Sequence, residues 1–150
     1  MLEIVSPGNK DSKHAFKEFV EKSQGFIKEG IHLIVIDLFP PTKRDPSGVH
    51  QAIWDEFEEQ DTEFTFPTGK SRILASYNSG RFKQAYVEPL GLLERLPEMP
   101  LFLSSQEYVK VPLVSTYESC WSVMPKVFRD YVETGIAPAG IQDLVAEERG

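Results

Sequence analysis

Residues 31–39, IHLIVIDLF, are almost continuously apolar and rich in β-branched side chains. A strand that is covered on both faces has this pattern, and such strands usually belong to parallel sheets. Gly30 precedes the segment and suits the end of a helix, because glycine readily adopts the left-handed conformation found there. The segment therefore predicts a buried strand of an α/β domain.

Toward the N-terminus, LEIV (residues 2–5) predicts a short strand and SPGNKDS (6–12) a loop. A helix with one apolar face is expected from a cap at Asp11 or Ser12 to about Lys28. Strand, helix and strand form a βαβ unit, so residues 2–5 and 31–38 are predicted to be parallel neighbours with a right-handed crossover.

Beyond residue 39 the sequence alternates between turn-rich and regular stretches. PPTKRDPSG (40–48) predicts a loop and LPEMP (96–100) an irregular segment, because its two prolines oppose regular structure. An antiparallel hairpin is expected around residues 78–80. The other expected elements are a helix at 49–57, hairpin strands at 72–77 and 84–89, a helix at 113–123, and a helix to about 133 with Pro125 in its first turn.

The predicted fold class is α/β, with a mixed sheet built on the βαβ unit 2–39 and extended by the antiparallel hairpin. A length of 150 residues fits one domain, which we place at 1–134, followed by a loosely ordered C-terminal tail at 135–150.

Composition excludes several classes of protein. Cys120 is the single cysteine, so a fold held by intrachain disulfides is excluded. No apolar run approaches the ~18 residues of a membrane span, and MLEIVSPGNK does not resemble a signal peptide. A cytoplasmic protein is therefore expected. The net charge of -7, with six acidic groups in DEFEEQDTE (55–63), predicts no broad affinity for nucleic acids.

A first candidate site consists of Glu3, Ser6, Asn9 and Lys22. Glu3 is a carboxylate within a strand of a type that is normally apolar. A helical wheel places Lys22 at the border of the apolar face, from where its long stem can bring the ammonium toward Glu3. A carboxylate that holds Mg²⁺ beside a lysine is typical of phosphodiester cleavage. The alternative is a structural ion pair or an exposed strand end.

Asp37 belongs to the buried strand and has two interpretations. It is either a hydrogen-bonded structural carboxylate or a second polar group beside Glu3, in which case it would be a further metal ligand. No two of His14, His32 and His50 have the spacing of metal ligands, and none pairs with Cys120 in such a spacing, so a zinc site is not predicted.

A second candidate site binds an anion at the start of the first helix. Free N–H groups and the helix dipole favour negative charge there, and Ser6, Asn9, Lys10 and Lys13 would assist. The G-x-x-x-x-G-K-[ST] pattern of a phosphate-binding loop is absent. In the alternative interpretation, Asp11 caps the helix and occupies the site.

Two stretches, LEIVSPGNK and VEKSQGFIKEGIHLIVIDLF, resemble the bacterial family named domain of unknown function 4058. That family has an I-E-V-L-S-P-x-N-K strand and loop, a helix with E-K-R, and a G-V-H-L-V-E-I-D-L strand. The distance from Glu3 to Gly30 matches, and Lys22 falls on the family's helix lysine. AYVEPLGLLERLPEMPLFL resembles a later strand and L-P-x-x-P-L motif, so the resemblance covers roughly residues 1–133.

The strand with Glu3 and the helix lysine also resemble the Uma2-type branch of the PD-(D/E)XK nuclease superfamily. The resemblance implies a restriction-endonuclease-like fold in which Glu3 is a metal ligand and Lys22 the catalytic lysine, moved to the helix because Val5 occupies its usual position. The superfamily's Pro-Asp strand precedes the Glu strand, where this chain has only Met1. The resemblance therefore implies a domain that is incomplete at its N-terminus.

Two functions follow as expectations. The first is a non-catalytic or truncated PD-(D/E)XK-like module for binding or interaction. The second is a Mg²⁺-dependent nuclease-like phosphodiesterase, completed by a missing N-terminal segment or a partner chain; only this reading implies a cofactor. A partner chain and self-association both remain open, and neither substrate nor ligand follows from the sequence.

Overall fold

The computed structural model describes residues 1–57 and 63–136, which comprise a mixed α/β arrangement. The chain divides into two compact units, Met1–Leu113 and Val114–Gly150. The predicted boundary between a domain at 1–134 and a tail stays a prediction, because residues 137–150 lie outside the described part. In that part, no helix has the length and apolar character needed to span a membrane.

The first unit is built on a four-stranded sheet with the order β1-β2-β3-β4. Its strands are β1 (Leu2–Ile4), β2 (Leu33–Asp37), β3 (Arg72–Asn78) and β4 (Gln84–Leu90). β1 and β2 are parallel, as predicted, while β3 is antiparallel to both β2 and β4. The mixed sheet, the parallel pair and the hairpin are thus confirmed.

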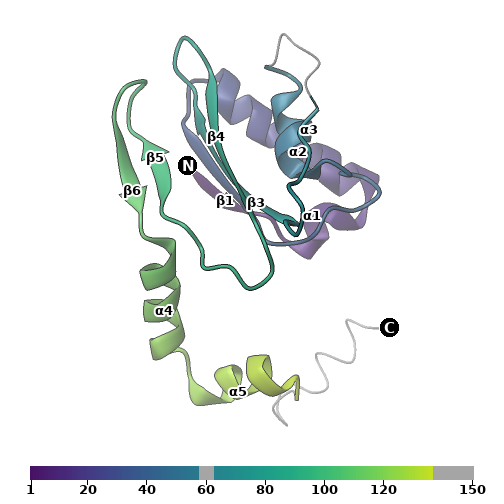
Figure 1. The fold of residues 1–150 in the computed structure, drawn as a ribbon, viewed down its shortest axis with the longest axis vertical. Helices are drawn as coiled ribbons and strands as arrows, with labels where there is room; N and C mark the ends of the chain where they lie inside the picture. Colours follow the sequence, from purple (N-terminus) through teal and green to yellow (C-terminus); the bar gives the residue numbers. More distant parts are fainter. Residues whose placement is uncertain (58–62, 137–150) are drawn as a thin grey trace. The chain divides into compact units, whose positions relative to one another are not determined.

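Helices cover one face of this sheet (Figure 1). They are α1 (Pro7–Asp11), α2 (Lys13–Lys28) and α3 (Gly48–Trp54). The core on this side includes Val5, Phe19, Ile27, Val35 and Tyr77, all at most 3% exposed. The helical spacing of Phe19 and Ile27 produces the apolar face of α2, and Gly30 follows the helix with φ of 81°.

A two-stranded antiparallel sheet, β5 (Met99–Phe102) with β6 (Tyr108–Val111), lies on the other face. Met99 is fully buried there against Ile34 and Leu74 of the large sheet. The prediction that residues 96–100 are irregular is therefore wrong for Met99 and Pro100, which belong to β5.

Pro100 is compatible with β5 because of the pairing pattern. Leu103 N–H donates to the Glu107 carbonyl, so alternation along the ladder places Pro100 opposite Lys110 in a non-hydrogen-bonded pair. The missing N–H thus costs no ladder bond. The Pro100 carbonyl, also directed away from β6, accepts a hydrogen bond from the Ser76 hydroxyl of β3.

The loop predicted at residues 6–12 is also wrong, because Pro7–Asp11 form α1. Ser6 and Asn9 form a reciprocal capping box, and Pro7 occupies the first turn, where its missing N–H has no intrahelical partner to lose. Ser12, not Asp11, caps α2 by accepting from Ala15 N–H at 3.0 Å.

The second unit contains α4 (Leu113–Val123), whose first residue belongs to the first unit, and α5 (Lys126–Thr134). The bounds of α4 match the prediction. Pro125 is the N-cap of α5 and so lies just before the first turn in which it was expected. Gly135 ends α5 with φ of 71°, a left-handed conformation that glycine adopts without steric cost.

Candidate functional site

Glu3 and Lys22 meet on the helix-covered face of the sheet. Glu3 pairs with Val35 of β2, and since the Val35 side chain is in the core beneath α2, Glu3 points to the same side. Lys22 Nζ donates to Glu3 Oε2 at 2.8 Å, with 46% of the lysine and 22% of the glutamate side chain exposed. The predicted contact is confirmed. Its catalytic role stays a prediction.

The Lys22 ammonium also lies over an aromatic ring of the core. Its Nζ lies 5.4 Å from the centroid of the Phe19 ring, within the range of a cation–π contact. The Phe19 ring therefore packs against the Lys22 ammonium, while both charged side chains remain partly exposed to solvent. A ligand could reach both charged groups.

Ser6 and Asn9 satisfy each other. Asn9 Oδ1 accepts from Ser6 N–H at 2.8 Å and from the Ser6 hydroxyl at 2.9 Å, and Asn9 N–H donates to Ser6 Oγ at 3.4 Å. These bonds use the groups that the predicted anion site needs. Ser6 and Asn9 therefore cap the start of α1, and this structural role explains the presence of both residues.

Lys10 points into the protein. Its Nζ lies 2.7 Å from Asp37 Oδ2 and 2.8 Å from Asp45 Oδ2, and all three side chains are at most 5% exposed. The helical turn of α1 rotates Lys10 inward, whereas Lys13, at the start of α2, is exposed. The structure therefore does not bring Lys10 and Lys13 together for an anion, which corrects the expected site.

The carboxylates of this buried cluster differ in their partners. Asp37 Oδ1 accepts from Phe39 N–H at 3.2 Å, and Asp45 Oδ1 accepts from Thr42 N–H at 2.8 Å. Burial raises the pKa of Asp37, although the hydrogen bond and charge of Lys10 act in the opposite direction. Asp45 Oδ2 is close to Lys10 but outside hydrogen-bond geometry, so its contact is an ionic one.

Asp37 and Glu3 lie on the same face of the sheet, because Asp37 follows Val35 by two residues. Each carboxylate nevertheless has its own lysine, Lys22 for Glu3 and Lys10 for Asp37. Among residues 1–57 and 63–136, no three His, Cys, Asp or Glu side chains gather into a group that could hold a metal ion. Asp37 is best described as the structural carboxylate of the two interpretations.

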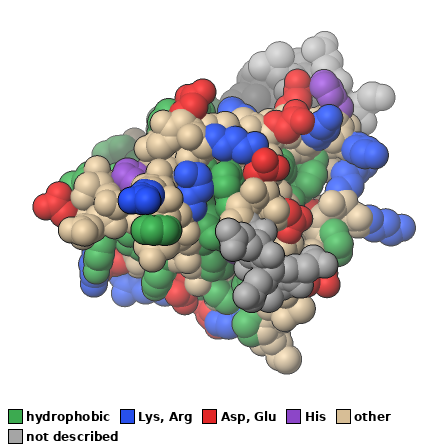
Figure 2. Space-filling view, turned by 90° about the horizontal axis from the view of Figure 1, so that it is seen from above, with side chains coloured by type: hydrophobic (Ala, Val, Ile, Leu, Met, Phe, Trp, Pro, Cys, Tyr) green, Lys and Arg blue, Asp and Glu red, His purple; other side chains and the backbone are tan. Residues whose placement is uncertain are grey.

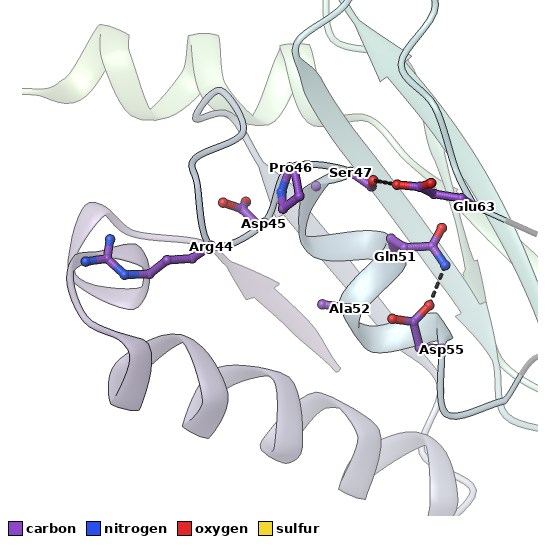
Figure 3. Close-up of a pocket in the computed structure, with 9 residues that line it drawn as sticks. Arg44, Asp45, Pro46, Ser47, Gln51, Ala52, Asp55 and Glu63 are labelled. Atoms are coloured by element: carbon purple, nitrogen blue, oxygen red, sulfur yellow. Dashed lines mark hydrogen bonds between the residues drawn. The ribbon is translucent and has the colours of Figure 1, made fainter. Parts of the chain in front are cut away.

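An open pocket of about 340 Å³ borders the buried cluster (Figure 3). Asp45 and Arg44 extend toward α1, where Arg44 Nη1 donates to the Lys10 carbonyl at 2.9 Å. At the other end Ser47 Oγ donates to Glu63 Oε1 at 2.7 Å, and Gln51 donates to Asp55. The polar groups drawn in this pocket are therefore mostly engaged with each other.

A second pocket, of about 270 Å³, adjoins the first and shares Gln51 and Glu63 with it. It is lined by His50, Trp54 and Phe64 together with Ala85 and Val87 of β4. His50 Nδ1 and the buried Tyr77 hydroxyl lie 3.0 Å apart. Burial lowers the pKa of His50 to about 4, so its ring is neutral at pH 7.

Neither pocket was expected from the sequence. The i, i+4 spacing of His50 and Trp54 was a signal that both would lie on one face of α3. Phe64 and the strand residues come from segments whose proximity depends on the tertiary fold.

Comparison of the chain with protein-family models, with curated proteins and with solved structures gives no match.

Proposed function

We propose that residues 1–113 form a non-catalytic binding module of the PD-(D/E)XK-like type, related to the domain of unknown function 4058 family. Its binding edge is the outer side of β1, which receives an extended strand of a partner protein. The observation that carries the proposal is the outer edge of β1, with which no strand of residues 1–57 or 63–136 pairs, beside the Glu3–Lys22 pair.

The register defines which backbone groups are directed outward. Met1, Glu3 and Val5 bond to β2, with Ile34 N–H donating to the Met1 carbonyl and Val5 N–H to the Ile36 carbonyl. In a parallel ladder the intervening residues, Leu2 and Ile4, direct their N–H and C=O groups away from β2. No strand in the described part of the chain pairs with that side. An added strand would satisfy these groups.

Side chains along β1 give the edge two chemically different faces. Leu2 is 42% and Ile4 62% exposed, next to the buried Ile34 and Ile36 of β2. The opposite face carries Glu3 and Lys22. The structure thus favours a partner strand that alternates apolar residues, packed beside Leu2 and Ile4, with polar residues beside the ion pair.

Surface charge agrees with a protein partner rather than a polyanion. The net charge is -7, and on the face shown in Figure 2 acidic and basic side chains are interspersed. A nucleic acid needs a concentration of Lys and Arg, because phosphate contacts supply most of its non-specific affinity.

Hydrogen exchange tests the edge directly. A panel of synthetic peptides with alternating valine and polar residues is added to the protein, with proline-interrupted peptides as controls. Binding should protect the amides of Leu2 and Ile4, while the Glu3 amide, already bonded to β2, stays unchanged. Ile4→Lys should abolish binding, and Leu93→Lys, at a side chain that is 96% exposed, is the matched control.

Binding that survives Ile4→Lys, or that leaves the Leu2 and Ile4 amides unprotected, would overturn the assignment of the edge. Concentration-dependent protection of both amides without peptide, together with a dimer in analytical ultracentrifugation, would instead assign the edge to a second copy.

A Mg²⁺-dependent nuclease-like activity is the second candidate, and the 2.8 Å contact of Lys22 with Glu3 favours it. Mg²⁺ keeps its waters unless several anionic groups replace them, and Asp37 is engaged by Lys10. We therefore expect little or no cleavage of DNA or RNA with Mg²⁺ or Mn²⁺. Cleavage that disappears in both Glu3→Gln and Lys22→Ala would establish the enzyme instead. Cleavage that appears only when a partner strand is present would show a shared active site.

A further inference from the structure

The pocket between α3, β4 and Phe64 has two chemically distinct parts. Its walls are aromatic and apolar, and a carboxylate, Glu63, stands in its lining beside the amide of Gln51. We propose that this pocket binds an organic ammonium cation whose nitrogen carries methyl groups. No residue of this site takes part in the binding edge of β1.

The aromatic rings are arranged as a corner. The His50 and Phe64 rings are almost perpendicular, at 88° with centroids 5.6 Å apart. The Trp54 ring is tilted by only 26° from His50. The ring planes of Phe64 and Trp54 are therefore steeply inclined to each other, and both side chains line the pocket. Walls of this kind present electron-rich π-systems to a cation from more than one direction.

Packing holds these walls in place before any ligand arrives. Trp54 stacks on the fully buried Tyr77 at 5.7 Å, and Phe64 contacts Phe66 edge-on at 5.3 Å. The Phe64 N–H also donates to the Gln51 side chain. A preformed pocket loses little conformational entropy on binding, which favours a small ligand.

The charges around the pocket select a cation over a neutral molecule. Glu63 contributes a carboxylate, and the adjoining pocket that shares it is lined by two further carboxylates, Asp45 and Asp55. One cation, Arg44, also lines that adjoining pocket, and its guanidinium donates to the Lys10 carbonyl. His50 is neutral at pH 7 because burial lowers its pKa to about 4, so it does not repel a cation. Ser47 engages Glu63 Oε1 through a neutral hydroxyl, which orients the carboxylate without cancelling its charge.

The apolar walls favour a methylated ammonium over a primary one. Ala85 and Val87 of β4 offer no hydrogen-bond acceptor from their side chains. Of the polar lining groups, Gln51 Oε1 already accepts from Phe64 N–H and Glu63 Oε1 from Ser47. A primary ammonium has three donors to satisfy on leaving water, whereas a quaternary ammonium has none. Two sources share this chemistry, a free choline-like molecule and a methylated lysine side chain.

Titration followed by NMR can test the site, because the chain has two tryptophans, Trp54 in the pocket and Trp121 in α4. Choline is one probe, and N-acetyl-trimethyllysine amide represents the modified side chain. The neutral isostere 3,3-dimethylbutanol is the control ligand. We expect choline or the lysine derivative to shift the Trp54 indole signal and leave Trp121 unchanged, with Kd on the order of 1 mM for so small a ligand. The isostere should bind about tenfold more weakly.

Glu63→Gln preserves size and should weaken binding of the cations, but not of the isostere, by about fivefold, the upper end for an exposed ion pair. Glu98→Gln removes a different surface carboxylate, paired with Lys110, and is the matched control. Tighter binding of choline assigns a free small molecule, and tighter binding of the lysine derivative assigns a modified side chain. The proposal is overturned if neither cation binds better than the isostere or if Glu63→Gln and Glu98→Gln behave alike.

Discussion

Two lysine–carboxylate sites lie on one side of the same sheet and differ in their access to water. Lys22 and Glu3 are partly exposed, whereas Lys10, Asp37 and Asp45 are buried. Both have ion-pair distances between 2.7 and 2.8 Å. The partly exposed Lys22–Glu3 pair is accessible to a ligand. The buried cluster of Lys10, Asp37 and Asp45 instead joins α1, β2 and the loop after β2. Distance alone would not distinguish these roles.

Lys10→Met should have the greatest effect on stability. The variant leaves two buried carboxylates without their cation, and breaking a buried ion pair typically costs about 3–5 kcal/mol. We expect the free energy of unfolding, measured by urea denaturation, to fall by that amount. Lys17→Met, at an exposed pair with Glu21, is the control and should change it by less than about 0.5 kcal/mol. Equal effects of the two variants would contradict the distinction between the sites.

Asp37→Asn should have an intermediate effect on stability. We expect the free energy of unfolding to fall by about 1–2 kcal/mol at neutral pH, because Lys10 keeps Asp45 as a partner. Burial raises the pKa of Asp37, so its contribution to stability is fully present below the ordinary pKa of 3.8 and is lost as pH rises through the folded value. The wild type gains this contribution on acidification and the variant cannot. The difference in the free energy of unfolding between wild type and Asp37→Asn should therefore grow as the pH falls. Urea denaturation at several pH values measures this difference. A deficit that stays constant would mean that Asp37 titrates normally.

Lys22→Met should lower the free energy of unfolding least of the three variants. The methionine keeps an unbranched apolar side chain while the charge is lost, and a solvent-exposed ion pair contributes only about 0.2–1 kcal/mol. We expect the difference from wild type in the free energy of unfolding to disappear between about 0.05 M and about 1 M NaCl, because salt screens exposed charges. A larger loss that persists in high salt would place Lys22 among the structural lysines.

Local sequence patterns were sufficient for part of the fold. The apolar run around β2 predicted a buried strand, and helical spacing placed Lys22 near enough to Glu3 for their contact to be expected. These inferences required only the periodicity of one element and the position of its neighbour.

The other features of the fold and of the candidate site depend on contacts between segments that are distant in the sequence. The sequence predicts Lys10 in a loop beside an anion, because it does not show that Pro7 and the Ser6–Asn9 capping box form a helical turn and direct the lysine inward. Asp45 belonged to a loop with no distinguishing pattern. β5 was missed because Pro100 argues against a strand until its partner strand and the direction of the ladder are known.

The positions of the prolines also have a consequence for aggregation. β4, an edge strand of the large sheet, contains Pro89, and β5 contains Pro100, whereas β1 has no proline in Leu2–Ile4. Edge strands lacking such protection are where sheets of separate molecules join most readily. The short length of β1 and the charge of Glu3 limit this joining, so β1 combines a usable hydrogen-bonding edge with restricted growth into larger assemblies.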